Sequence, residues 1–160
     1  MKKLFLLFAV AFSGTTFAQS TLKDDIDVVQ SVYGKSKSEL VSQYMALSGT
    51  QATDFAKIYD AYEIERKKLG EEKIHLINQY ATDYANLTDD KADAIAKGAL
   101  KNNIAYDKLY SSYYEKVKKA IGATNATKFI QLEIYLQTEI RSSLQNAIPF
   151  VGELEMSKVK

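Results

Sequence analysis

Apolar residues recur at intervals of three and four along most of the chain, which is the spacing of one face of an α-helix. The longest such stripe runs from residue 50 to residue 87 and corresponds to about ten helical turns. Its members are Phe55, Tyr59, Tyr62, Leu69, Leu76, Tyr80, Tyr84 and Leu87. The pattern predicts one long helix over these residues.

Two further stripes predict two more long helices. The first covers residues 89–120 and follows Thr88, whose side chain is a good N-cap for a helix with an acidic first turn. The second covers residues 125–147 and ends before Pro149, the only proline of the chain. Thr124 is the predicted N-cap of this last helix. Short turns between the three predicted helices would make neighbouring helices antiparallel.

Two shorter amphipathic segments precede the long helices. Residues 21–33 include three aspartates near their start and place apolar residues three and four positions apart. Ser36 or Ser38 is the expected N-cap of a second segment, which extends to Leu47. The sequence therefore predicts an all-α protein, either an antiparallel helical bundle or a long helical hairpin, with two short N-terminal helices.

The first 18 residues have the three-part form of a secretory signal peptide. Lys2 and Lys3 form a basic start, an apolar run covers residues 4–12, and small or hydroxyl residues lead to Ala18. We expect cleavage after Ala18, so the mature protein is expected in the periplasm or outside the cell. The apolar run is shorter than the roughly 20 residues that a transmembrane helix needs, and no membrane span is expected in the mature chain.

Cleavage would leave 142 of the 160 residues, which is the size of one ordinary domain. We predict a single all-helical domain over residues 19–151, after the signal peptide of residues 1–18, and a frayed C-terminal tail over residues 152–160. The chain contains no cysteine, so the stability of this domain must come from packing and not from disulfides.

The charge of the chain excludes one class of partner. Loss of Lys2 and Lys3 with the signal peptide lowers the number of basic residues from 21 to 19, against 20 acidic residues. The mature chain is then nearly neutral, and its basic and acidic side chains are interleaved. A nucleic-acid partner is not expected, because such proteins carry a basic stripe or patch.

One pair of residues has the spacing of metal ligands. Glu72 and His75 lie three positions apart on one face of the longest predicted helix, as do the Glu-x-x-His pairs of di-iron bundles. Such a centre needs a second pair and further carboxylates, whereas His75 is the only histidine and the chain has no cysteine. Two interpretations stay open, namely a surface Zn or Cu site at Glu72 and His75 and a purely structural role for both.

No residue pattern predicts catalysis. A Ser-His-Asp arrangement would have to use His75, which lies within a predicted helix among charged residues, and no strand-turn-helix elbow presents a nucleophile. The sequence has no glycine-rich phosphate loop, and its adjacent carboxylates occupy helix starts or solvated faces. We therefore expect a protein that is not an enzyme and that has no cofactor.

Two charged residues fall on apolar stripes. Arg66 follows Tyr62 on the stripe of the longest predicted helix. Glu133 lies four residues after Phe129 on the stripe of the last predicted helix. Because an unpaired buried charge is costly, we predict an ion pair between Arg66 and Glu133, or a lysine at the edge of the stripe in place of Arg66. Such a pair has either a structural role or a role in ligand binding.

Tyrosine is the main aromatic residue beyond the predicted signal peptide, and seven of the eleven tyrosines follow helical stripes. These seven are Tyr59, Tyr62, Tyr80, Tyr84, Tyr106, Tyr110 and Tyr113. If they belong to the core, their hydroxyls reach the edge of the bundle. If they are exposed, they form an interaction face for an unfolded chain, an apolar small molecule or a membrane protein.

Two predicted helix starts carry similar five-residue motifs. Their characteristic residues are Leu47, Ser48 and Gln51 in the first copy, and Ile121, Thr124 and Asn125 in the second. This tandem resembles the Spy/CpxP-type periplasmic helical family, in which two LTxxQ motifs begin helices of a long-hairpin fold. The segment from Ala126 to Glu133, with Phe150 downstream, also resembles small secreted bacterial proteins that share the pattern. The resemblance implies ATP-independent chaperoning, envelope-stress signalling or metal sensing.

These observations lead to three hypotheses about function. The first is a secreted or periplasmic, non-enzymatic helical binding protein, either chaperone-like or part of an envelope-stress response, whose partner is a protein client or an envelope protein. The second is a structural or accessory subunit of an envelope complex. The third is a metal-responsive envelope protein that uses Glu72 and His75. A homodimer would bury tyrosine and leucine side chains that a single bundle leaves exposed.

Overall fold

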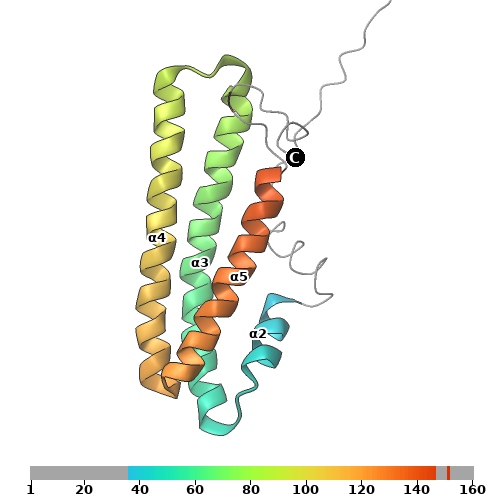
Figure 1. Ribbon diagram of the computed structural model, residues 1–160, viewed down its shortest axis with the longest axis vertical. Helices are drawn as coiled ribbons and strands as arrows, with labels where there is room; N and C mark the ends of the chain where they lie inside the picture. Colours follow the sequence, from blue (N-terminus) through green and yellow to red (C-terminus); the bar gives the residue numbers. More distant parts are fainter. Residues whose placement is uncertain (1–35, 147–150, 152–160) are drawn as a thin grey trace, which may run out of the picture.

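The computed structural model of the chain describes residues 36–146 and residue 151 (Figure 1). Four α-helices and no strand are found in this part. They are α2 (Lys37–Met45), α3 (Gly49–Asp83), α4 (Asp89–Ile121) and α5 (Ala123–Asn146), and a short 3-10 helix, η1 (Tyr84–Asn86), follows α3. The all-α prediction is therefore confirmed for these residues. The predicted signal peptide, the predicted helix over residues 21–33 and the tail over residues 152–160 lie outside the described residues.

The start of α2 is fixed by a capping box at Ser36, one of its two predicted N-caps. The backbone N–H of Glu39 donates to the Ser36 hydroxyl at 3.3 Å, and the backbone N–H of Ser36 donates to the Glu39 carboxylate at 3.0 Å. After nine residues the helix ends at Ala46, which adopts a left-handed conformation with a φ of 51°. This early end makes α2 much shorter than the three helices that follow it.

The long helices α3 and α4 begin with different kinds of cap. Thr88 caps α4 as predicted, because the backbone N–H of Lys91 donates to its hydroxyl at 3.4 Å. Ser48 occupies the N-cap position of α3, but its side chain makes no capping hydrogen bond. The start of α3 therefore does not depend on a hydroxyl cap. The extended backbone of Ser48 and the positive φ of Gly49, 58°, turn the chain into α3 instead.

The turn between α4 and α5 is tighter than the sequence suggested. Gly122, with a φ of 89°, ends α4, and its N–H donates to the carbonyl of Lys118 at 3.0 Å. Its own carbonyl already accepts from the N–H of Ala126 at 3.1 Å, so α5 starts directly after it, at Ala123. Thr124 consequently lies inside α5, and its prediction as the N-cap is wrong.

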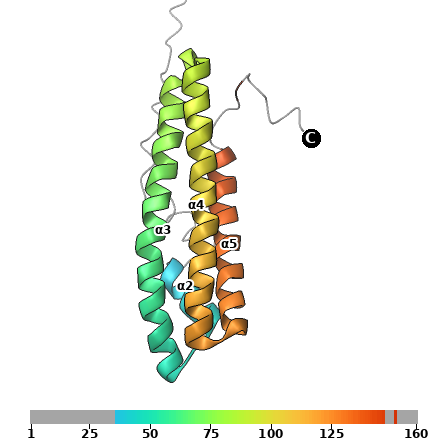
Figure 2. The same ribbon diagram turned by 90° about the vertical axis from the view of Figure 1, so that its left-hand side faces the viewer.

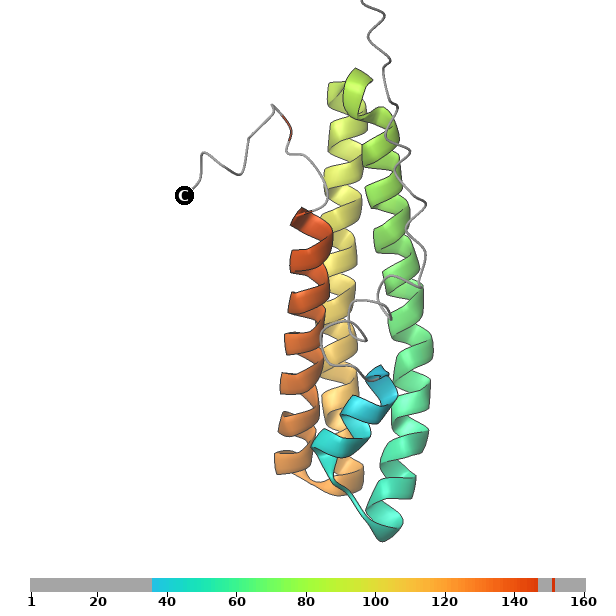
Figure 3. The ribbon, with the colours of Figure 1, turned by 90° about the vertical axis from the view of Figure 1, so that its right-hand side faces the viewer.

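The helices α3 and α4 form a long antiparallel hairpin, and α5 returns alongside them (Figures 1 and 2). The short helix α2 lies between α3 and α5 near the end that holds the α4–α5 turn (Figure 3). We call this end the lower half of the bundle, and we call the end that holds η1 the upper half. The four helices are thus side by side only in the lower half.

The main core lies in the lower half, where α2 closes the groove between α3 and α5. Its buried members are Val41, Met45, Phe55, Tyr59, Tyr62, Leu109, Tyr113, Val117, Ile121, Ala126 and Phe129. Phe129 is its centre, because its ring makes edge-to-face contacts with Phe55, Tyr59 and Tyr62 at centroid distances of 5.3, 6.2 and 5.2 Å. This half is closed by side chains from all four helices.

In the upper half, α3 and α4 approach each other closely at Gly98. A β-carbon at this position would lie 2.6 Å from Cδ2 of Leu76, which is closer than packed atoms tolerate. The glycine of α4 therefore leaves room for the leucine of α3. None of the described helices is long and apolar enough to cross a membrane.

Candidate functional site

Two features of the bundle qualify as candidate sites, and the first is a buried cluster of charges in the lower half. The ammonium of Lys37, at the start of α2, lies 2.5 Å from Oε1 of Glu63 in α3 and 2.8 Å from Oε2 of Glu133 in α5. The hydroxyl of Tyr62 donates to the same Oε2 at 2.7 Å. Arg66 binds Glu63 through Nε at 2.9 Å and Nη2 at 3.2 Å. The cluster joins three helices.

The predicted partner of Glu133 is corrected by these contacts. Glu133 is bound by Lys37, not by Arg66, and the Arg66 guanidinium instead takes the two oxygens of Glu63. Glu63 is three residues before Arg66 on the same helix, so it is within reach without any tertiary adjustment. The predicted alternative, a lysine in place of Arg66, is the arrangement found. That lysine comes from the N-terminal end of α2 and not from the edge of a long stripe.

The cluster is shielded from water, and this changes the acidity of its members. Burial by itself raises the pKa of the Glu63 carboxyl, but the charges of Lys37 and Arg66 and their hydrogen bonds together hold that pKa below its ordinary value of 4.5. The pKa values of Tyr59 and Tyr62 are raised far above 10.0, mainly by burial and also by the neighbouring carboxylates. Glu63 is thus held ionised, and both tyrosines are held neutral.

The cluster has the properties of a structural element and not of a ligand site. It combines two cations with two carboxylates, so its formal charge is zero. Glu133 is completely buried, and Tyr62 closes it from one side. The other carboxylate oxygen, Oε1, accepts no hydrogen bond from the described residues. An anion buried in this way depends strongly on its cation, so Lys37 ties α2 to the rest of the bundle.

The tyrosine stripe is mostly interior. Tyr59, Tyr62, Tyr106 and Tyr113 are buried, with at most 7% of their surface exposed. The remaining three, Tyr80, Tyr84 and Tyr110, are half-buried. The seven tyrosines therefore do not form one interaction face, because the stripes of α3 and α4 face each other and α5. Tyr113 shows how the hydroxyls reach the edge: it donates to Glu65 at 2.7 Å, and burial with this bond raises its pKa to about 12.

Glu72 and His75 lie on the exposed side of α3. The described residues contain no group of three or more histidine, cysteine, aspartate or glutamate side chains that could hold a metal ion. Within that part of the chain no such group forms around this pair, and two ligands on a solvated face make a poor site for Zn or Cu.

Some residues of the two helix-start motifs have packing roles, and others are exposed. Leu47 is half-buried against the lower core, whereas Ser48 and Gln51 are exposed. In the second copy, Ile121 is a buried core residue at the end of α4, and the side chain of Asn125 donates to its carbonyl at 3.0 Å. The two motifs therefore stabilise the turns at the lower end of the bundle.

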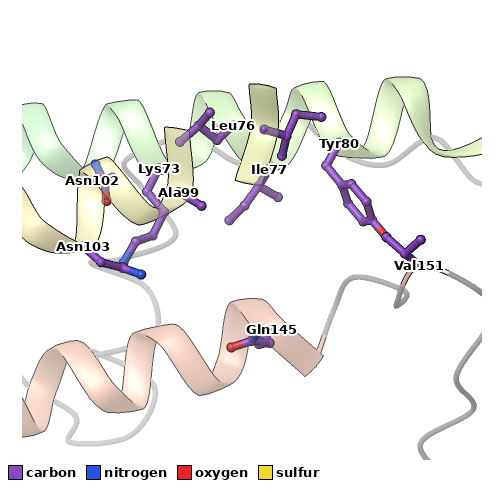
Figure 4. Close-up of a pocket in the computed structure, with 10 residues that line it drawn as sticks. Lys73, Leu76, Ile77, Tyr80, Ala99, Asn102, Asn103, Gln145 and Val151 are labelled. Carbon is purple, nitrogen blue, oxygen red and sulfur yellow. The ribbon is translucent and has the colours of Figure 1, made fainter. Parts of the chain in front are cut away.

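The second candidate site is an apolar cavity of about 280 Å³ in the upper half, between α3, α4 and the end of α5 (Figure 4). Its volume is just below the roughly 300 Å³ at which the usual range of small-ligand pockets begins. The lining side chains of α3 and α4 that are apolar are Leu76, Ile77, Tyr80, Ile95 and Ala99. Gln145 of α5 and Val151 complete the described lining. In the lower half α2 occupies the space between α3 and α5, whereas in the upper half the cavity lies beside the same two helices.

One end of the cavity is polar. Figure 4 shows Lys73, Asn102 and Asn103 gathered there, away from Tyr80 and Val151 at the opposite end. The Lys73 ammonium is buried and lies 4.8 Å from the centroid of the Tyr106 ring. It therefore brings a positive charge to the wall of an otherwise apolar space.

Asn102 supplies an acceptor at the same end. Only 4% of its surface is exposed, and its Nδ2 donates to the carbonyl of Leu69 at 2.9 Å. This bond fixes the orientation of the amide, so Oδ1 is left as the acceptor. Among the described residues, nothing donates to Oδ1. Buried polar atoms are nearly always hydrogen-bonded, so an orphaned acceptor in a cavity wall is informative.

A second hollow adjoins the cavity and adds another cation. It shares Lys73, Ile77, Asn103 and Gln145 with the first and is also lined by Arg141 and Leu144 of α5. The described lining of both hollows includes no acidic side chain. The polar end of the cavity is therefore complementary to an anion.

Comparison of the chain with known proteins identifies no relative. No protein-family model matches it, and searches of the curated proteins and of the solved structures find no match. What the fold and the sites define is a class, an all-helical protein with a sealed charge cluster and an apolar cavity. The resemblance to the Spy/CpxP-type family stays a prediction.

The candidate functional residues that the sequence pattern did not reveal are the polar ones in this cavity. Lys73 and Asn102 fall beside the apolar stripes of α3 and α4, where charged and polar residues are usually solvated. The available signal was Asn102 itself, which occurs one turn from Tyr106 on the interior side of α4. Lys37 was missed because its partner, Glu133, is 96 residues away.

Proposed function

We propose that this protein is an exported, non-enzymatic binding protein that holds an apolar ligand in the cavity of the upper half. The observation that carries the proposal is the combination of an open apolar cavity with a few convergent polar groups, which is the usual composition of a small-ligand site. The sealed lower half serves as the scaffold. The predicted export to the periplasm or beyond is part of this proposal and rests on the signal-peptide pattern of residues 1–18.

A neutral fluorescent probe tests the binding function directly. N-phenylnaphthylamine fluoresces strongly when it leaves water, so titration of the chain should give a saturable signal with one site per chain. Ile77→Asp should abolish that signal, because a carboxylate in the wall opposes entry of an apolar ring. The matched control is Ile134→Asp, since Ile134 is 47% exposed on α5 and does not line the cavity. Equal signals from both variants would contradict the proposal.

A chaperone-like function is the second candidate, and exposed apolar residues favour it. Leu100 and Ile104 lie one turn apart on α4 with 63% and 55% of their surface exposed. Ile134 and Tyr135 of α5 are also about half-exposed. Such side chains can contact an unfolded protein client or a partner subunit of an envelope complex.

Suppression of client aggregation distinguishes the two candidates. If the exposed residues act on clients, the chain should reduce light scattering by an aggregating client at near-stoichiometric ratios without ATP. Leu100→Glu with Ile104→Glu should then remove this effect, while Ile77→Asp should leave it intact. If a stable envelope partner is bound instead, pull-down from envelope extracts should recover it with the wild type and lose it with the double variant. No effect on several clients and no recovered partner would reject this second candidate.

A further inference from the structure

The polar end of the upper cavity has features that restrict the ligand beyond being apolar. Two cations, Lys73 and Arg141, belong to the lining of the two joined hollows, and the described lining has no acidic residue. A neutral hydrocarbon would make no ionic contact with these cations. A ligand with an anionic headgroup would use them and would leave its apolar part for the walls formed by Leu76, Ile77 and Ile95.

The acceptor of Asn102 adds a second requirement. Its Oδ1 receives no hydrogen bond from the described residues, and its amide is held in place by the bond of Nδ2 to the Leu69 carbonyl. A plain carboxylate has no hydrogen to donate to this oxygen. A headgroup that carries a hydroxyl beside the carboxylate has both parts, because the carboxylate can meet Lys73 while the hydroxyl donates to Asn102.

We propose that the cavity binds a hydroxy fatty acid, a single alkyl chain with a carboxylate and a neighbouring hydroxyl, with its headgroup at Lys73 and Asn102. Its chain extends from there towards Tyr80, where Figure 4 shows the far end of the cavity. The cavity of about 280 Å³ has room for one chain and not for the two chains of a phospholipid. This inference rests on the proposed binding function and names the ligand class for the same site.

Calorimetric titration of the full exported chain with four single-chain probes tests the inference without any substitution. The probes are β-hydroxydodecanoate, dodecanoate, dodecanol and dodecyltrimethylammonium, each kept below its micelle-forming concentration. We expect affinity to decrease in that order, with a step of about tenfold between dodecanoate and dodecanol because an ionic hydrogen bond is lost. Equal affinity for all four probes would overturn the headgroup assignment and leave the general binding function standing.

Three variants test which residue causes each difference in affinity between the probes. Lys73→Met should weaken dodecanoate about tenfold and leave dodecanol unchanged. Asn102→Leu should remove the advantage of β-hydroxydodecanoate over dodecanoate and leave dodecanoate itself unchanged. The matched control is Lys101→Met, an exposed lysine of α4 outside both hollows, which should change nothing. If Lys101→Met weakened dodecanoate as much as Lys73→Met, general surface charge would explain the preference and the inference would be wrong.

Three further outcomes show whether the inference, the proposed function or both are wrong. If neither the four amphiphiles nor N-phenylnaphthylamine bind to the full chain or to a variant without residues 19–33, both fail together. If the full chain binds none of them but a variant without residues 19–33 does, the occupant is the chain's own N-terminal segment, and the fatty-acid assignment is overturned. Binding of N-phenylnaphthylamine without any preference for carboxylates rejects the ligand class alone.

Discussion

The lower and upper halves of the bundle are built from the same three long helices but differ in what occupies the space between α3 and α5. In the lower half, α2 fills it with Val41 and Met45 and anchors itself through Lys37. In the upper half, the described residues leave an apolar cavity with a polar end. The comparison teaches that a short fourth helix can leave one bundle with a closed core at one end and an apolar cavity at the other, without any change in its long helices.

The largest expected difference between the halves is in the free energy of unfolding that is lost when a side chain is truncated. Phe129 is fully buried and contacts three aromatic rings, so Phe129→Ala should lower the free energy of unfolding by about 4 kcal/mol. Ile95→Ala removes a half-buried side chain from the cavity wall and should cost roughly 1 kcal/mol. Urea denaturation followed by circular dichroism measures both. Equal losses would show that the two halves are packed alike.

The charge cluster offers the next largest effect. Lys37→Met leaves the buried carboxylate of Glu133 without its cation and should cost about 3 kcal/mol. Adding Glu133→Leu to this variant should restore part of the loss, because no buried charge is then left unpaired. Lys57→Met, at an exposed position of α3, is the control and should change the free energy of unfolding by less than about 0.5 kcal/mol. If Lys37→Met behaves like Lys57→Met, the cluster does not anchor α2.

Enlarging one alanine in each half compares the packing directly. Ala126 is fully buried in the lower core, so Ala126→Leu should overpack it and cost roughly 2 kcal/mol. Ala99 lines the cavity, so Ala99→Leu has space to enter and should leave the thermal midpoint nearly unchanged. It should also block N-phenylnaphthylamine. The prediction fails if both variants lose stability equally.

The dependence of stability on pH should be smaller and should come from the lower half. The pKa of Glu63 is held below 4.5 in the folded protein, so its contribution is present above that pH and is lost as the pH falls through the folded pKa. Tyr59 and Tyr62 have raised pKa values, so above pH 10.0 the unfolded chain releases protons first and stability falls as the pH rises. Urea midpoints over a pH series should show both losses.

Two variants check the acid side of this profile. Glu63→Gln should flatten the decrease of the urea midpoint at low pH, because it removes the group whose pKa is depressed. Glu72→Gln, at an exposed position of the same helix, should leave the decrease as it is. The assignment to Glu63 is refuted if the exposed variant flattens the profile equally.

How far the sequence predicts this molecule depends on the range of the interactions involved. The three long helices follow from local spacing, and the caps at Ser36 and Thr88 follow from side chains that reach their own first turn. Thr124 was misassigned because the positive φ of Gly122 lets α5 begin without a hydroxyl cap. Helical periodicity and capping therefore predict which segments are helices. They do not predict where a helix starts when a glycine with a positive φ sets that start.

The candidate site was less predictable because it depends on contacts between distant residues. Arg66 and Glu133 were correctly placed as buried charges, but the pairing depends on Lys37, which enters only when α2 docks. The cavity depends on the opposite circumstance, since α2 begins at Lys37, beside Glu63, which is 13 residues before Leu76 on α3, and α2 runs from there towards the lower end. Neither the docking nor the length of the groove left uncovered is encoded in the pattern of a single helix.

Methyl NMR of isoleucine tests the central claim, that the upper half binds ligand and the lower half does not. Ile77 and Ile95 line the cavity, whereas Ile58 and Ile121 pack in the lower core. Titration with dodecanoate should shift the methyl signals of Ile77 and Ile95 saturably and leave those of Ile58 and Ile121 unchanged. Shifts at Ile58 and Ile121, with none at Ile77 and Ile95, would contradict the account.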